Sequence, residues 1–356
     1  MSLGIGLRNK FLYLLIITLL LTSCNKQKTE EERNNFKIIS FYEGYYDAFG
    51  TLIDDSENLF YYTRRGVSHV GDSGTSIVQM KIDKNFEKNI EVKKIYEDEN
   101  NNIDVRNIGG GKINKVHYLF LAKYNPALAK KWVGFGYIKY DTSNEQITYT
   151  EIGLNNYDFI NPHGHLIKVE NIYYQPIYAK KDGYYDIVLL KSIDNGNSWS
   201  FGSIVYHGQT YYNETSGEYM GNGTIRLVIR NNIRNGMVQF ISTDYGNSWS
   251  GPATVNIKSG DTNVPYTCKV DDKMYLIYTD RNDSKLKVSY LKDNNEFHIP
   301  KVLAVAENNN TWFLGYSPIV YDGKNFYTLY GDHQGDYKST KTYFLKFNKE
   351  YLNFGQ

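Results

Sequence analysis

The chain has 356 residues and a formal net charge of +1, from 40 basic and 39 acidic residues. A charge this close to zero excludes nucleic-acid binding through bulk electrostatic attraction, so no nucleic-acid partner is expected. Two cysteines, Cys24 and Cys268, exclude a framework of disulfides. The 34 Tyr, 17 Phe and 30 Gly favour β-strands joined by tight turns, which predicts an all-β fold.

The first 24 residues have the pattern of a secretory signal. Arg8 and Lys10 precede the apolar run FLYLLIITLLL, and Thr-Ser-Cys follows it directly, ending at Cys24. The run is short for a membrane span. Its end, Leu-Thr-Ser-Cys, looks like a bacterial lipobox, in which the cysteine is lipidated and becomes the mature N-terminus. An ordinary signal or a short anchor is the alternative. We expect an extracytoplasmic, monomeric protein of the bacterial cell envelope, lipid-anchored to the outer membrane or cell surface through Cys24.

Residues 25–35 (NKQKTEEERNN) are predicted to be a polar tether, and residues 36–356 to form one domain. Related segments recur along that domain, with intervals of 58, 53, 50, 49 and 55 residues between the markers Asp83, Asp141, Asp194, Asp244, Asp293 and Asn348. Six marks at this spacing predict a six-bladed β-propeller with four strands in each blade. The chain ends soon after the sixth mark, so FKIISFY (36–42) is expected to supply the outer strand of the last blade.

Two of these segments are strong copies of one motif. SIDNGNSW (192–199) and STDYGNSW (242–249) share Ser-x-Asp-x-Gly-x-Ser-Trp. Asp and Ser hydrogen-bond the amides of a tight turn, Gly supplies a positive φ, and Trp packs against a neighbouring sheet. The motif resembles the Asp-box, or BNR repeat, of the sialidase (neuraminidase) superfamily, which closes the hairpin between the third and fourth strands of a blade. The resemblance implies a sialidase-like propeller in which these boxes are structural.

The same resemblance implies a catalytic tyrosine and its base. In LGYSPIVYDGKNFYTLYGD (314–332), Gly-Tyr-Ser matches the segment of the family that carries the nucleophile, which assigns that role to Tyr316. A neutral phenol suits a sugar with a carboxylate at its anomeric carbon, because a charged carboxylate nucleophile would be repelled. In YYNETSGEYMGNGTIRLVIRNN (211–232), Glu214 matches the glutamate that partners the tyrosine. Glu218 is the alternative base, because alternate residues share one face of a strand.

Arginines are expected to hold the carboxylate of the sugar. Arg230 matches one member of the family's arginine cluster and Arg281 resembles another, and the planar guanidinium suits bidentate binding. In a β-protein, Glu218 and Arg281 are equally consistent with cross-strand pairs on a solvated face. The family begins its first inner strand with Arg-Ile-Pro, but residues 45–50 read YYDAFG here. The loss of one charge-assisted contact weakens carboxylate binding by about 1.5–3 kcal/mol.

A charge-rich loop lies in the expected first blade, within FYYTRRGVSHVGDSGTSIVQMKID (60–83). Asp72 matches the acid/base aspartate of the family, and Arg65 resembles an arginine that contacts the sugar. Arg64 and His69 belong to the same cluster and are further candidates for substrate binding. Either Arg64 or Arg65 compensates for the missing arginine, or the substrate is another sugar.

No metal or other cofactor is expected. His163-Gly164-His165 places two imidazoles on one strand face, but the sequence supplies no third ligand. Three functions stay open, each with a glycan as partner. The first, which we favour, is a sialidase-like exo-glycosidase that hydrolyses a terminal acidic sugar through Tyr316. The second is a hydrolase or lyase of another acidic glycan on the same scaffold, and the third is a non-catalytic glycan-binding propeller.

Overall fold

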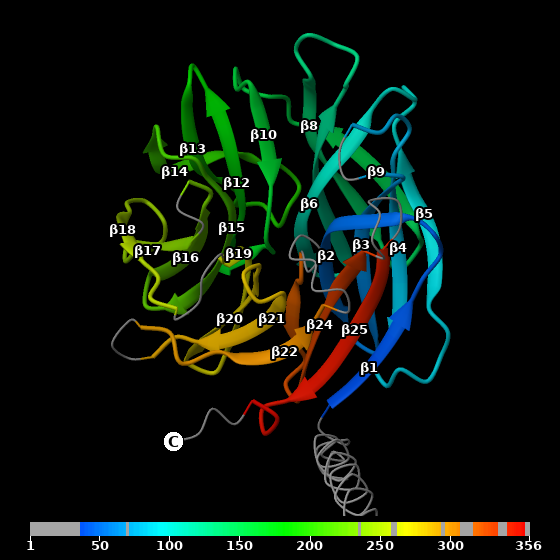
Figure 1. The fold of residues 1–356 in the computed structure, drawn as a ribbon. Coiled ribbons are helices and arrows are strands. Elements are labelled where there is room, and N and C mark those ends of the chain that lie inside the picture. The colour runs from blue at the N-terminus through cyan, green and yellow to red at the C-terminus, as the bar shows by residue number, and fades with distance from the viewer. Residues whose placement is uncertain are drawn as a thin grey trace, which may run out of the picture.

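Six antiparallel sheets surround a central axis in the computed structural model (Figure 1). It describes residues 36–68, 71–233, 236–257, 262–292, 296–306, 316–333 and 340–352, and every regular element within these ranges is a strand. The predicted six-bladed propeller is therefore confirmed. No helix in the described ranges is long and apolar enough to cross a membrane. The predicted signal (1–24), its Cys24 and the tether (25–35) lie outside these ranges.

Each blade is described from the axis outward. The first blade has β2 (Tyr46–Asp55), β3 (Asn58–Gly66), β4 (Ser76–Asp83) and β5 (Glu91–Glu97). The second has β6 (Asp104–Ile113), β7 (Val116–Tyr124), β8 (Trp132–Asp141) and β9 (Gln146–Glu151). In the third, β10 (Phe159–Pro162) and β11 (Ile167–Val169) share the inner position, followed by β12 (Ile172–Lys181), β13 (Tyr184–Ser192) and β14 (Ser200–Gly208).

The remaining blades repeat this order. The fourth has β15 (Tyr212–Gly221), β16 (Thr224–Asn231), β17 (Gly236–Ser242) and β18 (Ser250–Thr254). The fifth has β19 (Thr262–Val270), β20 (Lys273–Asp280), β21 (Lys285–Tyr290) and β22 (Lys301–Val305). The sixth has β23 (Ile319–Tyr321), β24 (Asn325–His333), β25 (Thr340–Asn348) and, as its outer strand, β1 (Phe36–Phe41).

The N-terminal strand closes the ring, as predicted. β1 pairs antiparallel with β25 in a continuous register from Phe36↔Phe347 to Phe41↔Thr342. In Figure 1 the blue β1 lies beside the red β25, although the two strands are at opposite ends of the chain. The pairing covers an edge of β25 that would otherwise expose unpaired backbone groups.

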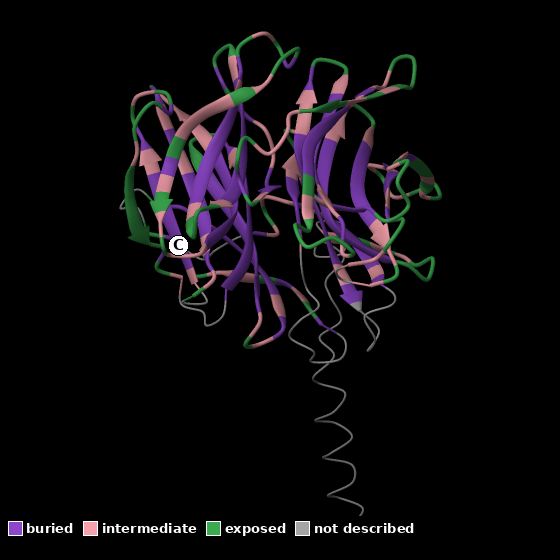
Figure 2. Cartoon of the chain, turned by 90° about the horizontal axis from the view of Figure 1, so that it is seen from above, coloured by how far each residue is buried: buried purple, intermediate pink, exposed green. Residues whose placement is uncertain are grey.

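Hydrophobic side chains fill the spaces between neighbouring blades. Among the described residues there are six large clusters, one for each pair of adjacent blades. The closing one joins Leu52 and Met80 of the first blade to Tyr327 and Phe344 of the sixth. Figure 2 shows buried positions along the strands and exposed positions mainly in loops and outer strands. All five residues of the outer strand β18 are exposed. Packing between blades therefore fixes the inner strands around the axis.

The repeated segments form the turns that follow the third strand of each blade. In the turn between β13 and β14, Ser198 donates from both its amide and its hydroxyl to Asp194, and the Gly196 amide donates to Ser192 Oγ. Gly196 has a φ of 82°. Trp199 packs edge-on against Phe120 of the second blade, with ring centroids 4.8 Å apart. This turn therefore has the geometry that its sequence predicts.

The topology defines two ends of the ring. We call the end where the inner strands begin the mouth end, and the opposite end the far end. Second strands return to the mouth end and third strands run back to the far end, so the repeated turns that the structure describes lie at the far end. Asp293, the fifth marker, lies outside the described residues. β1 runs antiparallel to the third strand β25, so it also begins at the far end.

Candidate active site at the mouth end

Backbone bulges shape the mouth end of the inner strands. The pairing register shifts near the starts of β2, β6, β15 and β19, at Ala48/Thr51, Arg106/Gly109, Tyr212/Thr215 and Asn263/Tyr266. A bulge leaves a residue unpaired and re-aims its side chain. Phe49 in the β2 bulge has a φ of 62°, and a Cβ on the following Gly50 would lie 2.3 Å from the Tyr61 ring. Only glycine fits there, so the sequence enforces the bulge.

The structure brings three predicted residues into direct contact. Tyr316, which precedes β23, donates its phenolic hydrogen to Glu214 Oε1 over 3.2 Å. Glu214 lies in the β15 bulge. Arg230, near the end of β16, donates from Nη1 to both oxygens of Glu214 at 3.1 Å. Two segments about a hundred residues apart in the sequence thus meet in the order phenol, carboxylate, guanidinium.

The surroundings of Glu214 and Tyr316 shift their pKa values in opposite directions. Burial opposes ionisation of Glu214, but the Arg230 guanidinium outweighs it and holds the pKa of Glu214 below its usual value. Burial raises the pKa of Tyr316 well above 10, and the negative charge of Glu214 raises it further. At neutral pH a protonated phenol therefore lies against an ionised carboxylate. This is the arrangement of a weak nucleophile and its general base.

Aromatic rings surround the phenol. Phe49 packs edge-on against Tyr316 with centroids 4.4 Å apart, and the His163 ring lies 6.1 Å from that of Tyr316 and 4.6 Å from that of Tyr266. The stretch where the family places its first arginine thus supplies an aromatic ring. Burial lowers the pKa of His163 to about 4, so its imidazole is neutral, and its Nδ1 donates to the Thr215 carbonyl over 3.1 Å.

Four buried polar atoms at the mouth end lack a hydrogen-bond partner in the described part of the chain. His163 Nε2, Asn161 Oδ1, Asn213 Oδ1 and Ser317 Oγ are buried and have no hydrogen-bond partner among the described residues. They belong to the starts of the third, fourth and sixth blades. A buried polar atom without a partner costs free energy, which a hydroxyl-rich ligand or water would recover. The site therefore offers acceptors as well as charges.

The two predicted histidines do not act together. Gly164, with a φ of 72°, interrupts the inner strand between β10 and β11. His163 contacts Tyr316 and Tyr266 at the mouth end, whereas His165 Nε2 lies 3.1 Å from Glu218 Oε1. The described residues contain no group of three or more His, Cys, Asp or Glu side chains that could hold a metal ion.

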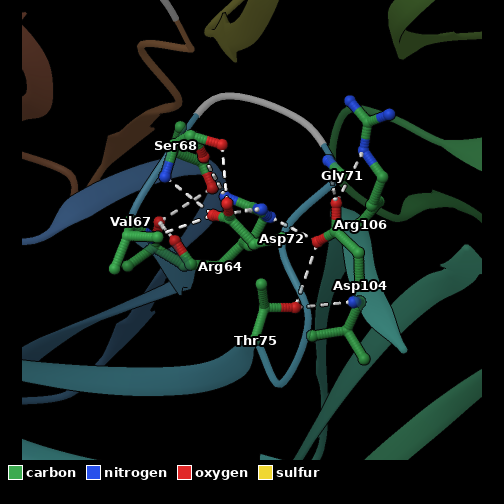
Figure 3. Close-up of polar contacts among 11 residues, drawn as sticks. Arg64, Val67, Ser68, Gly71, Asp72, Thr75, Asp104 and Arg106 are labelled. Atoms are coloured by element: carbon green, nitrogen blue, oxygen red, sulfur yellow. Dashed lines mark hydrogen bonds and ion pairs between the residues drawn. The ribbon is translucent and has the colours of Figure 1, made fainter. Parts of the chain in front are cut away.

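Arg64 is a buried structural residue. Its Nε donates to Asp104 Oδ1 over 2.7 Å, its Nη1 to the Ser68 carbonyl over 2.8 Å and its Nη2 to Asp72 Oδ2 over 3.2 Å. The Arg64 and Asp104 side chains are fully buried. Asp104 also accepts from Thr75 Oγ1 and from the Gly71 amide (Figure 3). Arg64 thus ties the β3–β4 loop to β6 and faces no substrate.

Asp72 holds the same loop closed. Its carboxylate accepts hydrogen bonds from the amides of Val67 and Ser68 at 2.8 and 2.7 Å, and from Ser68 Oγ at 2.6 Å (Figure 3). Partial burial opposes its ionisation, but the hydrogen bonds from Ser68 and Val67 keep the pKa of Asp72 below its usual value. A general acid has to be protonated at the working pH. The acid/base role stays a prediction, and in this arrangement Asp72 stabilises the loop.

Arg65 is neutralised by two carboxylates. Its Nε and Nη2 donate to the two oxygens of Asp47 at 2.9 Å each, and its Nη1 donates to Glu43 over 2.8 Å. Asp47 lies in the YYDAFG stretch that lacks the family's first arginine. Because Arg64 and Arg65 are both held by carboxylates, neither supplies the free guanidinium that was expected to compensate.

Arg106 is a mouth-end residue that the sequence analysis missed. Its guanidinium carbon lies 5.4 Å from the centre of the Phe49 ring, 5.8 Å from Tyr124 and 5.7 Å from Trp132. Its Nε atom is 3.9 Å from Asp104 Oδ2. This Nε atom is buried and has no hydrogen-bond partner among the described residues. Phe49 thus contacts both Arg106 and Tyr316. The available signal was its place near the start of a second inner strand, beside an acidic residue.

The other predicted residues are divided between the two ends. Arg281 directly follows β20, whose last residue pairs with the first residue of β19, so Arg281 lies at the mouth end. Glu218 is four residues beyond Glu214 on β15, roughly 13 Å along the strand, and pairs with His165 away from Tyr316. Glu218 is therefore not an alternative base for Tyr316. His69 lies outside the described residues.

The fold is similar to that of known sialidases. No protein-family model and no curated protein matches the sequence. A protein of unknown function from Dyadobacter fermentans has a TM-score of 0.75 at 14% identity, over 88% of this chain and 98% of that one. The Trypanosoma rangeli sialidase has a TM-score of 0.68 at 13% identity, over 89% of this chain and 58% of its own. The Hadza microbial sialidase Hz136 has a TM-score of 0.67 at 12% identity, over 90% and 67%. These identities establish a sialidase-like propeller and no more.

Proposed function

We propose that this protein is a glycoside hydrolase that releases a terminal acidic sugar, with Tyr316 as nucleophile and Glu214 as its base. The observation that carries the proposal is the 3.2 Å hydrogen bond from the Tyr316 phenol to Glu214, whose carboxylate Arg230 keeps ionised. A tyrosine that donates to a buried, ion-paired carboxylate at the mouth of a propeller has the contacts of an activated nucleophile.

The reaction proceeds by two displacements. The Tyr316 oxygen bonds to the anomeric carbon while the glycosidic bond breaks, the phenolic proton passes to Glu214, and an acid protonates the leaving oxygen. Water then attacks the anomeric carbon and gives a proton to the carboxylate that the acid left behind, while the tyrosine oxygen leaves and regains its proton from Glu214. Two inversions retain the anomeric configuration. Asp72 is the acid in this proposal: when the leaving oxygen replaces the hydrogen bonds from Val67 and Ser68, the pKa of Asp72 rises and its carboxyl group carries the proton that it donates.

Recognition of an acidic sugar falls to the cations that remain at the mouth end. We assign this role to Arg106, Arg230 and Arg281, because carboxylates engage every guanidinium nitrogen of Arg65 and the Arg64 side chain is fully buried. Arg230 also pairs with Glu214, through Nη1. The buried acceptors Asn161 Oδ1 and His163 Nε2 suit sugar hydroxyls. This set differs from the family's three-arginine clamp, in which the first inner strand contributes one member.

The test compares Tyr316→Phe with the wild-type protein on aryl glycosides of sialic and hexuronic acids. Removing one hydroxyl should lower turnover by about 100-fold or more, because only the nucleophile is lost. Tyr245→Phe, in an exposed far-end turn, is the matched control and should keep full activity. If Tyr316→Phe turns over a substrate at the wild-type rate, the proposed nucleophile is wrong.

The second candidate is a hydrolase or lyase for an acidic glycan other than a sialoside. It is favoured by Phe49, whose ring packs on Tyr316 from the stretch where the family has an arginine, and by the Asp47 that neutralises Arg65. Turnover of uronides in preference to sialosides would select it. Binding of acidic glycans with no turnover, equal in Tyr316→Phe, would instead select the binding module.

We further propose that Cys24 is lipidated and that the mouth faces away from the membrane. β1 begins at the far end, so a tether that joins Cys24 to Phe36 reaches the domain on the side opposite Tyr316. Substrates outside the cell envelope would then meet the mouth end of the propeller. Cys24→Ser should move the protein from the membrane to the soluble fraction. Unchanged retention in the membrane would contradict the anchor.

A further inference from the structure

A cavity of about 440 Å³ opens at the far end of the axis. We call it the far-end well. The ends of β2, β6, β15, β19 and β23 line it, together with β11 and the segment before it, so all six blades contribute. Its volume is within the range of small-molecule sites, about 300–1,000 Å³. No residue of the Tyr316, Glu214 and Arg230 group lines it.

Buried hydrogen bonds between the inner strands separate the well from the mouth end. Tyr266 Oη donates to the Gly50 carbonyl over 3.1 Å, and the Thr267 amide donates to Ser216 Oγ over 3.0 Å. Tyr266, Thr267 and Ser216 are at most 2% exposed. A ligand in the well would therefore not touch Tyr316. The well is a second site and not a deeper part of the first.

The well carries a surplus of positive charge. Lys112 pairs with Asp55 at 3.0 Å, and the lining Asp54 pairs with Lys84 at 2.6 Å, so these charges are balanced. Lys168 and Lys269 also line the well, and no carboxylate of the described residues lies within 4.0 Å of either amine. Cavities lined by one sign of charge concentrate ions of the opposite sign.

The other polar pair in the well adds hydrogen-bonding groups without net charge. His165 Nε2 lies 3.1 Å from Glu218 Oε1. Burial opposes protonation of His165, but the Glu218 carboxylate outweighs it and raises the pKa of the imidazole. The pair therefore contributes one positive and one negative charge when His165 is protonated. Tyr173 and Tyr321 complete the wall with aromatic rings, against which an apolar face can pack.

We propose that the far-end well is a second binding site, for a small organic anion the size of a monosaccharide. Lys168 and Lys269 bind its phosphate or carboxylate, and the tyrosine rings and the His165–Glu218 pair bind its body. Such an anion has two sources, a free sugar acid or sugar phosphate and the headgroup of an anionic lipid. A lipid headgroup is one of the two because β1 begins at this end of the ring, so the proposed tether from Cys24 would hold the far end toward the membrane. The proposal does not depend on catalysis at the mouth end.

Calorimetric titration with D-glucuronate and glucose 6-phosphate tests the site, with glucose as the neutral control. The titrated protein is the full chain with Cys24→Ser, in which Cys268 is the remaining cysteine. We expect both anions to bind at least tenfold more tightly than glucose. Lys168→Gln/Lys269→Gln should weaken them at least tenfold, whereas Tyr316→Phe and the matched Lys93→Gln should not. Equal affinity for glucose, or full affinity in the double lysine variant, would overturn the proposal.

Two further measurements locate the ligand and identify its source. Cys268 lines the well, so a bound anion should slow its alkylation by N-ethylmaleimide. Co-sedimentation with phosphatidylglycerol vesicles, lost in the double lysine variant and absent with phosphatidylcholine, would identify a lipid headgroup. Binding of the soluble anions alone would identify a free ligand. If neither soluble anions nor phosphatidylglycerol bind, or if Arg230→Gln abolishes binding while the lysine variant retains it, the far-end site does not exist.

Discussion

Replacing Arg230 by Gln tests the electrostatic state of Glu214. The Glu214 side chain is 4% exposed, and both its oxygens accept hydrogen bonds from Arg230 Nη1. Removing one partner of a buried ion pair costs about 3–5 kcal/mol, because an uncompensated charge stays buried. We expect Arg230→Gln to lower the free energy of unfolding by about this amount near pH 7.5.

The pH dependence should change sign in the variant. In the wild-type protein the pKa of Glu214 is lower in the folded state than in the unfolded state, where it is about 4.3. The ionised carboxylate therefore contributes fully to the free energy of unfolding above about pH 4.3, and this contribution is lost as the pH falls through the folded-state pKa. Without Arg230, burial dominates and raises the pKa of Glu214. The folded variant then binds more protons than its unfolded chain, so its stability should rise as the pH falls from about 7.5 to 5.

Urea unfolding at these two pH values, followed by tryptophan fluorescence, measures both effects. The matched control is Arg230→Gln/Glu214→Gln, which removes both charges. It should recover more than half of the lost free energy and show no reversed pH dependence. A cost below about 1 kcal/mol, as for an exposed pair, or an equal cost at both pH values, would refute the assignment of Glu214 as a buried carboxylate that depends on Arg230.

Two other predictions concern the scaffold and use the same unfolding assay. Arg64→Met should cost about 3–5 kcal/mol, because the buried Asp104 loses the cation that is hydrogen-bonded to it and keeps only Arg106 at 3.9 Å. Lys93→Met, which breaks an exposed pair with Glu145, should leave the midpoint unchanged, and equal effects would show that the Arg64 network is not structural. Gly196→Ala and Gly183→Ala both place alanine at positive φ, at a shared cost of about 1–2 kcal/mol. Only at Gly196 would the new Cβ also lie 2.5 Å from the Tyr118 ring, so Gly196→Ala should cost more, and equal losses would show that Tyr118 moves aside freely.

The fold could be predicted because its signals are local and repeated. The motif has two strong copies and four weaker ones, and the hydrogen bonds of Asp194 and Asp244 in the two strong copies involve neighbours within four residues. The spacing of the turns then counts the blades. Pairing of β1 with β25 follows from the missing outer strand of the sixth unit. The contact of Tyr316 with Glu214 also agrees with the sequence, because each residue lies in a recognisable local motif.

The remaining site residues depend on contacts between distant strands. Arg64 and Arg65 are adjacent, yet Asp104 of another blade buries one and Asp47 neutralises the other. Alternation along β15 predicts that Glu214 and Glu218 share one face of the strand. The strand runs along the axis, however, so the two residues lie toward different ends of the ring, and the bulge redirects the Glu214 side chain. For Arg106 the local signal, a place near the start of an inner strand, is weak, and its surroundings are the rings that three other segments place around it.

The most direct test of the catalytic account is the identity of the atom that becomes glycosylated. A glycosyl fluoride of the preferred acidic sugar, with a second fluorine beside the anomeric carbon to slow breakdown of the intermediate, is reacted with the protein. The digest is then sequenced by mass spectrometry. The account predicts one added sugar on the peptide that contains Tyr316, through its phenolic oxygen, and none in Tyr316→Phe. A sugar attached to another residue, or turnover in Tyr316→Phe that matches the wild-type protein, would contradict it.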